Sequence, residues 1–243
     1  MSMSIQSDIN EKQHILHCVD GELNTLNSLL LEMVNLVVMQ LDETMQALED
    51  GDIDRAEKVI IRDNVVNQYE IKIDAEALLV LASQCPVAID LRTVISVSKI
   101  ADELERIGDE ICDFARLVMV LFDPKTSDPN PKLLKDIVRI GNLVKLMLDK
   151  IIQLIETRNT FRVETLRHYV GECETVLQQG IEHQLHYAVQ DARLIGRALD
   201  IMQILKSLHR CGDFCKNIAE YMIYMVDGVV VPHQDNLLLE SSI

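Results

Sequence analysis

The chain has 243 residues, of which 48% are hydrophobic, while only 9 are glycine and 5 are proline. This composition excludes a disordered protein and a fold made of many turns, and it favours long helices. The formal net charge of −16 excludes a protein that holds nucleic acid by its phosphates, because the two would repel each other. It suits cations or basic surfaces of other proteins, although acidity also simply keeps a helical protein in solution.

Proline, glycine and capping residues divide the chain into six predicted helices. Apolar residues recur at every third or fourth position, which is the helical period. Gly51 suits the left-handed position that ends the first helix, and the stretch from Cys18 to Gly21 is a candidate early bend. Thr160 is a candidate cap for the fifth helix. The predicted helices span residues 7–49, 53–85, 87–121, 132–157, 160–190 and 191–227.

Three prolines in residues 123–131 mark the clearest linker, because proline cannot continue a helix. Each half of the chain then holds three helices, each with an apolar stripe that must be covered. We predict an all-α protein of two tandem three-helix bundles, laid side by side or end to end. The predicted parts are a first bundle over 1–122, the linker 123–131, a second bundle over 132–228 and a loose C-terminal tail over 229–243.

Neither a signal peptide nor membrane insertion is expected. The first residues have no basic start or apolar run, and no apolar segment reaches the roughly 20 residues of a bilayer span. Six cysteines occur without a Cys-x-x-Cys motif. These features predict a cytoplasmic protein with free thiols.

An internal repeat supports the two-bundle prediction. The frame Leu-x-Arg-x-Gly-Asp occurs at 104–109 and again at 208–213, on the third and the sixth predicted helix. A fixed motif found twice indicates a duplicated structural unit. Gly108 and Gly212 occupy the same place in the two copies. Since glycine weakens a helix, we expect another helix backbone to approach closely there, the alternative being a merely tolerated small residue.

The first copy carries an acidic stripe along one helix face. Its members are three or four residues apart, a spacing that makes like charges repel by roughly 0.2–0.5 kcal/mol per pair. A cation would relieve this repulsion, and carboxylate oxygens suit Mg²⁺, Mn²⁺, Ca²⁺ or iron. The alternative is a solvated face paired with Arg106 and Arg116. The acidic residues are Asp102, Glu105, Asp109 and Asp113.

The second copy has His209 in place of Glu105, four residues before Asp213. Imidazole is a softer ligand and would favour zinc or iron. The neighbouring Cys211 and Cys215 are predicted to be buried thiols. His183 and His186 are expected on a helix surface.

No catalytic set stands out. The sequence has no Gly-x-Ser-x-Gly motif and no phosphate-binding glycine-rich loop. A di-iron site needs two Glu-x-x-His pairs, and only Glu11 with His14 fits. We expect a protein that is not an enzyme.

The combination of these motifs resembles the PhoU family over residues 15–230. The first-repeat motif is Leu104-Glu-Arg-Ile-Gly-Asp109, and its helix opens with a family-like Pro86-Val-Ala-Ile-Asp-Leu-Arg92. The second half resembles the family at Asp191-Ala-Arg193, at Leu208-His-Arg-Cys-Gly-Asp213 and at Asn217-Ile-Ala-Glu220. The resemblance implies two three-helix bundles in a cytoplasmic, usually dimeric regulator of phosphate uptake.

The resemblance also implies partners and an activity. Such proteins connect the ATPase subunit of the high-affinity phosphate ABC transporter with the phosphate-sensor histidine kinase at the inner face of the membrane. With phosphate plentiful, they restrain uptake and keep the kinase from starting the starvation response. Two alternatives stay open: a metal-binding helical bundle with a storage or metal-dependent enzymatic role, and a structural spacer.

The family can also carry metal ions on Glu/Asp-x-x-x-Asp pairs, which implies a set of ligands in this chain for Mg, Mn, Fe or Zn. The first-repeat pair is Glu105 and Asp109, with Asn replacing Asp in the pair on the second helix. On the fifth helix Glu174 fits the second position and Val170 occupies the first, so the second site is altered. The implied metal-ligand set is Asp63, Asn67, Glu105, Asp109, Glu174, His209 and Asp213.

Overall fold

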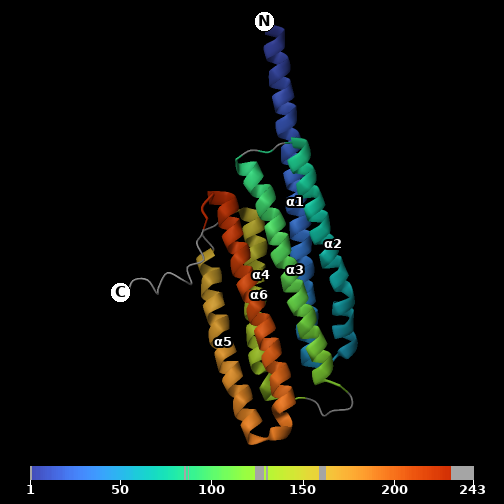
Figure 1. Cartoon of the computed structure of the whole chain (residues 1–243), viewed down its shortest axis with the longest axis vertical. Helices are drawn as coiled ribbons and strands as arrows, with labels where there is room; N and C mark the ends of the chain where they lie inside the picture. The colour runs from blue at the N-terminus through green and yellow to red at the C-terminus, as the bar shows by residue number, and fades with distance from the viewer. Residues whose placement is uncertain are drawn as a thin grey trace, which may run out of the picture.

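The computed structural model describes residues 2–84, 86, 88–123, 129, 131–158 and 163–230, with the side chains of 2–20, 84 and 164 left aside. The described residues form helices and no strand, which confirms the predicted all-α class (Figure 1). A short 3-10 helix, η2 (Ala192–Leu194), precedes the last helix. The α-helices are α1 (Ser2–Asp50), α2 (Ile53–Gln84), α3 (Ile89–Leu121), α4 (Pro131–Thr157), α5 (Val163–Gln190) and α6 (Ile195–Asp227).

The helix ends follow the chemistry of single residues. Gly51 and Gly228 adopt φ of 66° and 70° after α1 and α6, the left-handed conformation that glycine reaches without steric cost. Pro131 is the first residue of α4, where its missing N–H has no helical partner to lose. Helix α3 begins at Ile89, two residues later than predicted, because Ala88 has a positive φ of 49°. The candidate bend at 18–21 is absent, since α1 continues through it.

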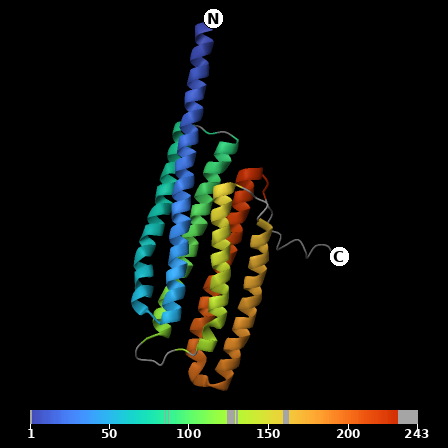
Figure 2. The ribbon, with the colours of Figure 1, turned by 180° about the vertical axis from the view of Figure 1, so that it is seen from behind.

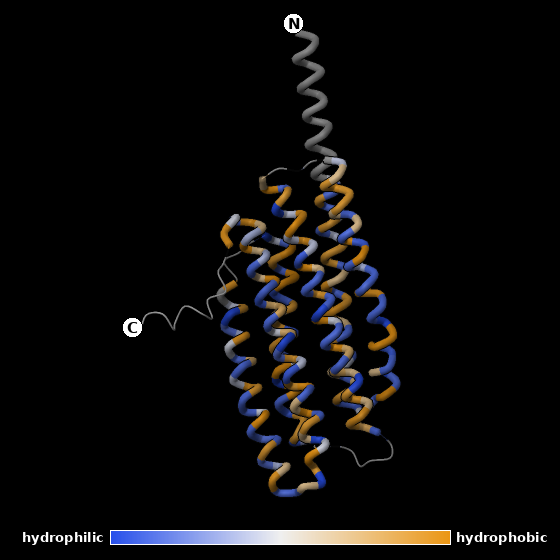
Figure 3. Tube along the Cα trace, in the orientation of Figure 1, coloured by the Kyte–Doolittle hydropathy of each residue, from blue (hydrophilic) through white to orange (hydrophobic). Residues whose placement is uncertain are grey.

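The two three-helix units lie side by side, which decides between the two predicted arrangements (Figures 1 and 2). Helices α3 and α6 form the most extensive contact between them, and α1 also packs on α4. Hydrophobic residues recur along every helix in Figure 3. The largest fully buried side chain is Phe114 on α3. One continuous core therefore joins the two repeats, and it fixes α3 and α6 at its centre.

The structure gives the register between the repeats. Every buried residue of α6 lies 104 positions after a buried residue of α3, as Gly212 does after Gly108. A Cβ on Gly108 would lie 3.0 Å from Asp63 Oδ1, and one on Gly212 would lie 3.8 Å from Cys173 Sγ. Gly108 also has Val66 Cγ1 at 3.5 Å and Gln40 Oε1 at 3.6 Å, and Gly212 has Met147 Cε at 3.2 Å. Cys173 on α5 is thus the counterpart of Val66 on α2, 107 positions earlier, the same interval that separates Met147 on α4 from Gln40 on α1. Side chains, rather than the predicted helix backbone, approach both glycines.

The thiols described are free and buried, as predicted. They are Cys112, Cys173, Cys211 and Cys215. Burial raises the pKa of the Cys173 thiol to about 12, with smaller contributions from nearby carboxylates. It therefore stays protonated at neutral pH. Cys18, Cys85 and the predicted cap Thr160 lie outside the described residues and side chains. Within the described helices, none combines the length and apolar character needed to cross a bilayer.

Replacing Gly51 with alanine is expected to lower the free energy of unfolding by about 1–2 kcal/mol, the cost of a left-handed conformation at a residue with a side chain. The new Cβ would also lie 2.9 Å from the Phe122 ring. Chemical denaturation measures the change. Gly171→Ala is the matched control, because nothing lies within 4 Å of its Cβ position and alanine favours a helix by about 0.8–1.0 kcal/mol. The explanation would be contradicted if Gly51→Ala stabilised the chain as much as Gly171→Ala does.

Candidate functional site

Three carboxylates of α2 and α3 meet in the first repeat. One oxygen atom each from Glu70, Asp74 and Asp102 lies within 4.8 Å of the others, and all three residues are half-buried. In the part of the chain that the structure describes, no other set of three His, Cys, Asp or Glu groups comes so close. We call these three residues the carboxylate triad.

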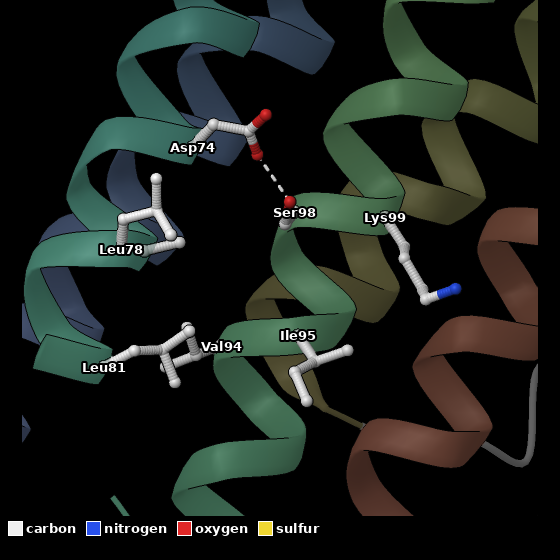
Figure 4. Close-up of a pocket in the computed structure, with 8 residues that line it drawn as sticks. Asp74, Leu78, Leu81, Val94, Ile95, Ser98 and Lys99 are labelled. Atoms are coloured by element: carbon white, nitrogen blue, oxygen red, sulfur yellow. Dashed lines mark hydrogen bonds between the residues drawn. The ribbon is translucent and has the colours of Figure 1, made fainter. Parts of the chain in front are cut away.

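Local helix geometry and one cross-helix contact position the triad. Glu70 and Asp74 are four residues apart and so share one face of α2. The Ser98 hydroxyl of α3 donates a hydrogen bond to Asp74 Oδ1 and fixes that carboxylate against α3 (Figure 4). Asp102 follows Ser98 by one turn. The pairing of α2 with α3 therefore brings the third carboxylate to the other two.

The acidic face continues along α3 beyond the triad. Partial burial raises the pKa of Glu105, and the carboxylates of Asp109, Glu70 and Asp63 raise it further. Burial likewise raises the pKa of Asp109, followed by the charges of Asp63 and Asp113. Glu105 and Asp109 therefore face the same side of α3, as their spacing predicted, and they lie close to α2.

The same causes act within the triad. Burial raises the pKa of Glu70, and Asp102, Asp74 and Asp109 add to the rise. Burial also raises the pKa of Asp102, followed by the charge of Asp74, while Arg106 and Lys99 act in the opposite direction. A group of carboxylates that disfavour one another's ionised form stores repulsion, which a proton or a cation relieves.

We expect the metal-free protein to become more stable as the pH falls from 7 to about 5. The pKa of Glu70, Asp102 and Glu105 is raised in the folded state. The folded chain therefore binds more protons than the unfolded chain between the ordinary pKa of about 4 and the raised value. The added stability is complete below the ordinary pKa and is lost as the pH rises through the raised one.

Thermal unfolding in the presence of a chelator measures this dependence. The Asp102→Asn variant should show a smaller rise in Tm over the same pH range, because one of the mutually repelling charges is gone. A Tm that falls on acidification in the wild-type chain, or an unchanged slope in the variant, would contradict the interpretation.

The predicted α2 residues occupy the inner side of this face. Asp63 is 8% exposed and accepts a hydrogen bond of 3.2 Å from Gln40 Nε2 of α1. Asn67 Oδ1 and Gln40 Oε1 are both buried, and neither has a hydrogen-bond partner. Orphaned oxygens beside an acidic face fit a site for a cation or an ordered water, since buried polar atoms are otherwise paired.

The alternative interpretation, local ion pairs, accounts for only one end of the stripe, at Asp113. Arg116 Nη1 lies 2.6 Å from Asp113 Oδ1, and both side chains are exposed. Arg106 Nη1 lies 3.6 Å from Glu103, a buried residue on the opposite side that also accepts a hydrogen bond from Asn217 of α6. Glu103 thus serves the contact between the two repeats rather than the acidic face.

The predicted residues of the second repeat meet in a different arrangement. His209 Nε2 lies 2.7 Å from Glu174 Oε2 of α5, and its Nδ1 lies 3.4 Å from Asp213 Oδ2 on α6. The register of 107 positions between α2 and α5 places Val170 and Glu174 at the counterparts of Asp63 and Asn67, which is the predicted alignment.

His183 and His186 are consistent with the predicted surface role. His183 Nδ1 lies 2.8 Å from Asp136 Oδ2, and His186 Nε2 lies 2.8 Å from Gln190 Nε2, with both histidines exposed. The side chains of Glu11 and His14 lie outside the described part of the chain.

Glu70 and Asp74 are absent from the predicted ligand set, although Asp102 was recognised within the stripe. The missed signal is Glu70-Ile-Lys-Ile-Asp74, which has the same four-residue spacing as Glu105 and Asp109. The triad with its oxygen-only donors can hold a hard divalent cation such as Mg²⁺ or Mn²⁺.

Comparison with known proteins agrees with the duplicated fold. The model of the PhoU domain matches residues 30–118 and 137–222, one match in each repeat. The phosphate-specific transport system accessory protein PhoU homolog of Pseudomonas aeruginosa is 34% identical over 220 residues, covering 90% of each chain. Its Escherichia coli counterpart, named phosphate-specific transport system accessory protein PhoU, is 32% identical over 223 residues, again 90% of each chain.

Two solved structures have the same fold. The crystal structure of PhoU from Pseudomonas aeruginosa matches with a TM-score of 0.80 over 86% of this chain and 99% of that one, at 34% identity. The phosphate transport system regulatory protein PhoU from Streptococcus pneumoniae matches with a TM-score of 0.79 at 23% identity, which shows the fold. With both repeats matched in order and similarity extending over most of its length, this chain belongs to the PhoU family.

Proposed function

We propose that the protein is a cytoplasmic, homodimeric regulator that restrains phosphate uptake and the phosphate-starvation response. The observation that carries this proposal is the family match over both repeats, with relatives named as accessory proteins of phosphate-specific transport. The protein acts as an adaptor between the ATPase subunit of the phosphate ABC transporter and the phosphate-sensor histidine kinase. These partners recruit it to the inner face of the membrane. Its role is regulatory rather than enzymatic.

Exposed apolar pairs at corresponding places support an adaptor with two contact surfaces. Leu91 and Ile95 are exposed near the start of α3. Ile195 and Leu199, each 104 positions later, are exposed at the start of α6. Because α3 and α6 run in opposite directions, the two pairs lie at opposite ends of the molecule (Figure 1). Apolar side chains that stay exposed in a soluble fold are suited to contact with other proteins.

A pocket adds to the surface at the start of α3. It lies between α2 and α3, has a volume of about 300 Å³ and is lined mainly by apolar side chains (Figure 4). Ile95 belongs to its lining, and Leu78 on α2 stands 66% exposed at its side. Such a pocket can take an apolar side chain of a partner, which is how a few anchoring residues provide most of the binding energy in protein contacts.

Deletion of the gene tests the regulatory role. In phosphate-rich medium, deletion should switch on a reporter driven by a phosphate-starvation promoter, and the wild-type gene should switch it off again. The reporter is to be measured at equal growth rates, so that a general defect does not imitate the effect. Unchanged reporter activity in the deletion strain would contradict the proposed function.

Pull-down with the purified transporter ATPase subunit and with the sensor kinase tests the adaptor role. We expect Leu91→Ser with Ile95→Ser to weaken capture of one partner, and Ile195→Ser with Leu199→Ser to weaken capture of the other. Leu146→Ser is the control, because Leu146 is an exposed apolar residue of α4 away from both helix starts. Wild-type capture of both partners by both double variants would contradict the assignment of these surfaces.

A second function, cation binding, is favoured by the carboxylate triad. We propose that Glu70, Asp74 and Asp102 hold a divalent metal ion, with Glu105 and Asp109 as further oxygen ligands along the same face. Asp63 and Asn67 support it from the inner side of α2. The all-oxygen donor set favours Mg²⁺ or Mn²⁺ over zinc. Bound metal neutralises the repulsion between α2 and α3 and so rigidifies the first repeat.

Elemental analysis of protein purified without chelator or added metal tests this second proposal. We expect bound divalent metal in the wild-type chain and a loss of it in the variant that combines Asp74→Asn with Asp102→Asn. Metal-free wild-type protein that also fails to take up Mn²⁺ on dialysis would contradict the proposal.

A further inference from the structure

The two repeats differ at the positions that correspond to the acidic face. The register of 107 positions between α2 and α5, and of 104 between α3 and α6, assigns a counterpart to each carboxylate of this face. Of the five carboxylates compared below, only Asp109 keeps a carboxylate in the second repeat. The counterparts of Glu70, Asp74, Asp102, Glu105 and Asp109 are Leu177, Ile181, Lys206, His209 and Asp213.

We propose that the second repeat has exchanged its cation site for a built-in contact between His209 and two carboxylates, so that the chain holds divalent metal in the first repeat alone. This inference rests on the proposed cation-binding function of the first repeat. In the second repeat, the His209 ring lies between Glu174 and Asp213 and takes the place that a metal takes in the first. Lys206 stands at the counterpart of Asp102 and adds a cation there. The residues present there therefore do not fit a metal cluster.

Apolar residues of α5 occupy the places of the two α2 ligands. Leu177, the counterpart of Glu70, is 8% exposed and belongs to the hydrophobic core. Ile181, the counterpart of Asp74, is partly buried and packs against the same core. Both α2 ligands of the triad are thus replaced by residues that pack the second core.

The imidazole is held on both of its nitrogen atoms. His209 Nε2 lies 2.7 Å from Glu174 and Nδ1 lies 3.4 Å from Asp213, and the His209 side chain is only 18% exposed. A histidine whose two nitrogens face carboxylates has no nitrogen atom left for a metal. The hydrogen bond from Gln178 and the charge of His209 lower the pKa of the Glu174 carboxyl, which favours its ionised form. Glu174 stands at the counterpart of Asn67, so the orphaned oxygen of the first repeat is replaced by a carboxylate that contacts His209.

Native mass spectrometry of the full chain, stripped with chelator and titrated with Mn²⁺, tests the proposal. We expect the combined Asp74→Asn and Asp102→Asn variant to bind Mn²⁺ at least about tenfold more weakly than the wild type. The combined Glu174→Gln and Asp213→Asn variant should bind as many ions as the wild type, within about twofold in affinity. A loss of ions in this second variant, or full residual binding in the first, would overturn the proposal.

A second measurement keeps the proposal testable if the wild type binds no Mn²⁺ at all, a result that would reject the cation-binding function itself. Thermal unfolding in chelator compares the effects on Tm of His209→Gln, Glu174→Gln and the two combined. We expect the fall in Tm of the double variant to be about 1–3 °C smaller than the sum of the two single falls, because each single change already breaks the same contact. Additive effects would overturn the built-in contact between His209 and Glu174 whatever the metal content.

Discussion

Replacing Phe114 with alanine is expected to lower the free energy of unfolding by about 3–5 kcal/mol. Phe114 is fully buried on α3, the helix that packs against both α2 and α6. Truncation removes the largest buried side chain and leaves a cavity that a bundle packed on all sides refills poorly. For a chain of this size the loss corresponds to a fall in Tm of roughly 6–20 °C.

Chemical denaturation with two probes, far-UV circular dichroism and fluorescence of a label on α5, measures this loss. Val120→Ala is the control on the same helix, since Val120 is 54% exposed, and it should change stability by less than about 0.5 kcal/mol. Because one core joins the repeats, both probes should report the same transition in the Phe114 variant. Two separate transitions, or a loss no larger than that of the control, would contradict a shared core.

Saturating Mn²⁺ is expected to raise the stability of the wild-type chain by about 2.7 kcal/mol when its concentration reaches 100 times the Kd. The cation relieves the repulsion among Glu70, Asp74 and Asp102. In the metal-free protein, burial and the neighbouring carboxylates raise the pKa of Glu70 and of Asp102. Asp102→Lys places the residue of the second repeat at its counterpart in the first. This variant should lose the Mn²⁺-dependent rise in Tm while folding normally, because its ammonium group already neutralises the face.

Glu57→Lys is the matched control for Asp102→Lys. It makes the same change in net charge at an exposed position of α2 that precedes the triad by more than three helical turns. The control should keep the full Mn²⁺-dependent rise in Tm. The same rise measured with Ca²⁺ at the same ionic strength provides the comparison between two divalent ions. An equal loss of response in both variants would mean that the cation acts on the overall charge rather than at the triad.

The fold followed from the sequence because its signals are local. Proline, glycine and the helical period place the helix ends near Gly51, Pro131 and Gly228, and the repeated motif indicates the duplication. The two errors, the bend predicted at 18–21 and the early start predicted for α3, also have local causes. Gly21 stays helical with nothing packed against it, and the backbone before α3 turns through an unfavourable φ at Ala88, which a search for start signals does not reveal.

The site was predicted from the sequence less well than the fold, because it depends on how two helices are placed against each other. The four-residue spacing showed that Glu105 and Asp109 share a face, and their common environment in the structure agrees. Which α2 residues oppose that face depends on the rotation and register of α2 against α3. This relation is set by core packing around Asp63 and Gly108, and periodicity within a single helix carries no information about it. Glu70 and Asp74 were missed for that reason.

Anomalous diffraction from crystals of the wild-type chain grown or soaked with Mn²⁺ tests the cation site most directly. The account predicts an anomalous peak between Glu70, Asp74 and Asp102, within bonding distance of their carboxylate oxygens, and no peak at His209. A peak at His209 and Asp213 with none at the triad, or no ordered Mn²⁺ at either place at concentrations that saturate binding in solution, would contradict it.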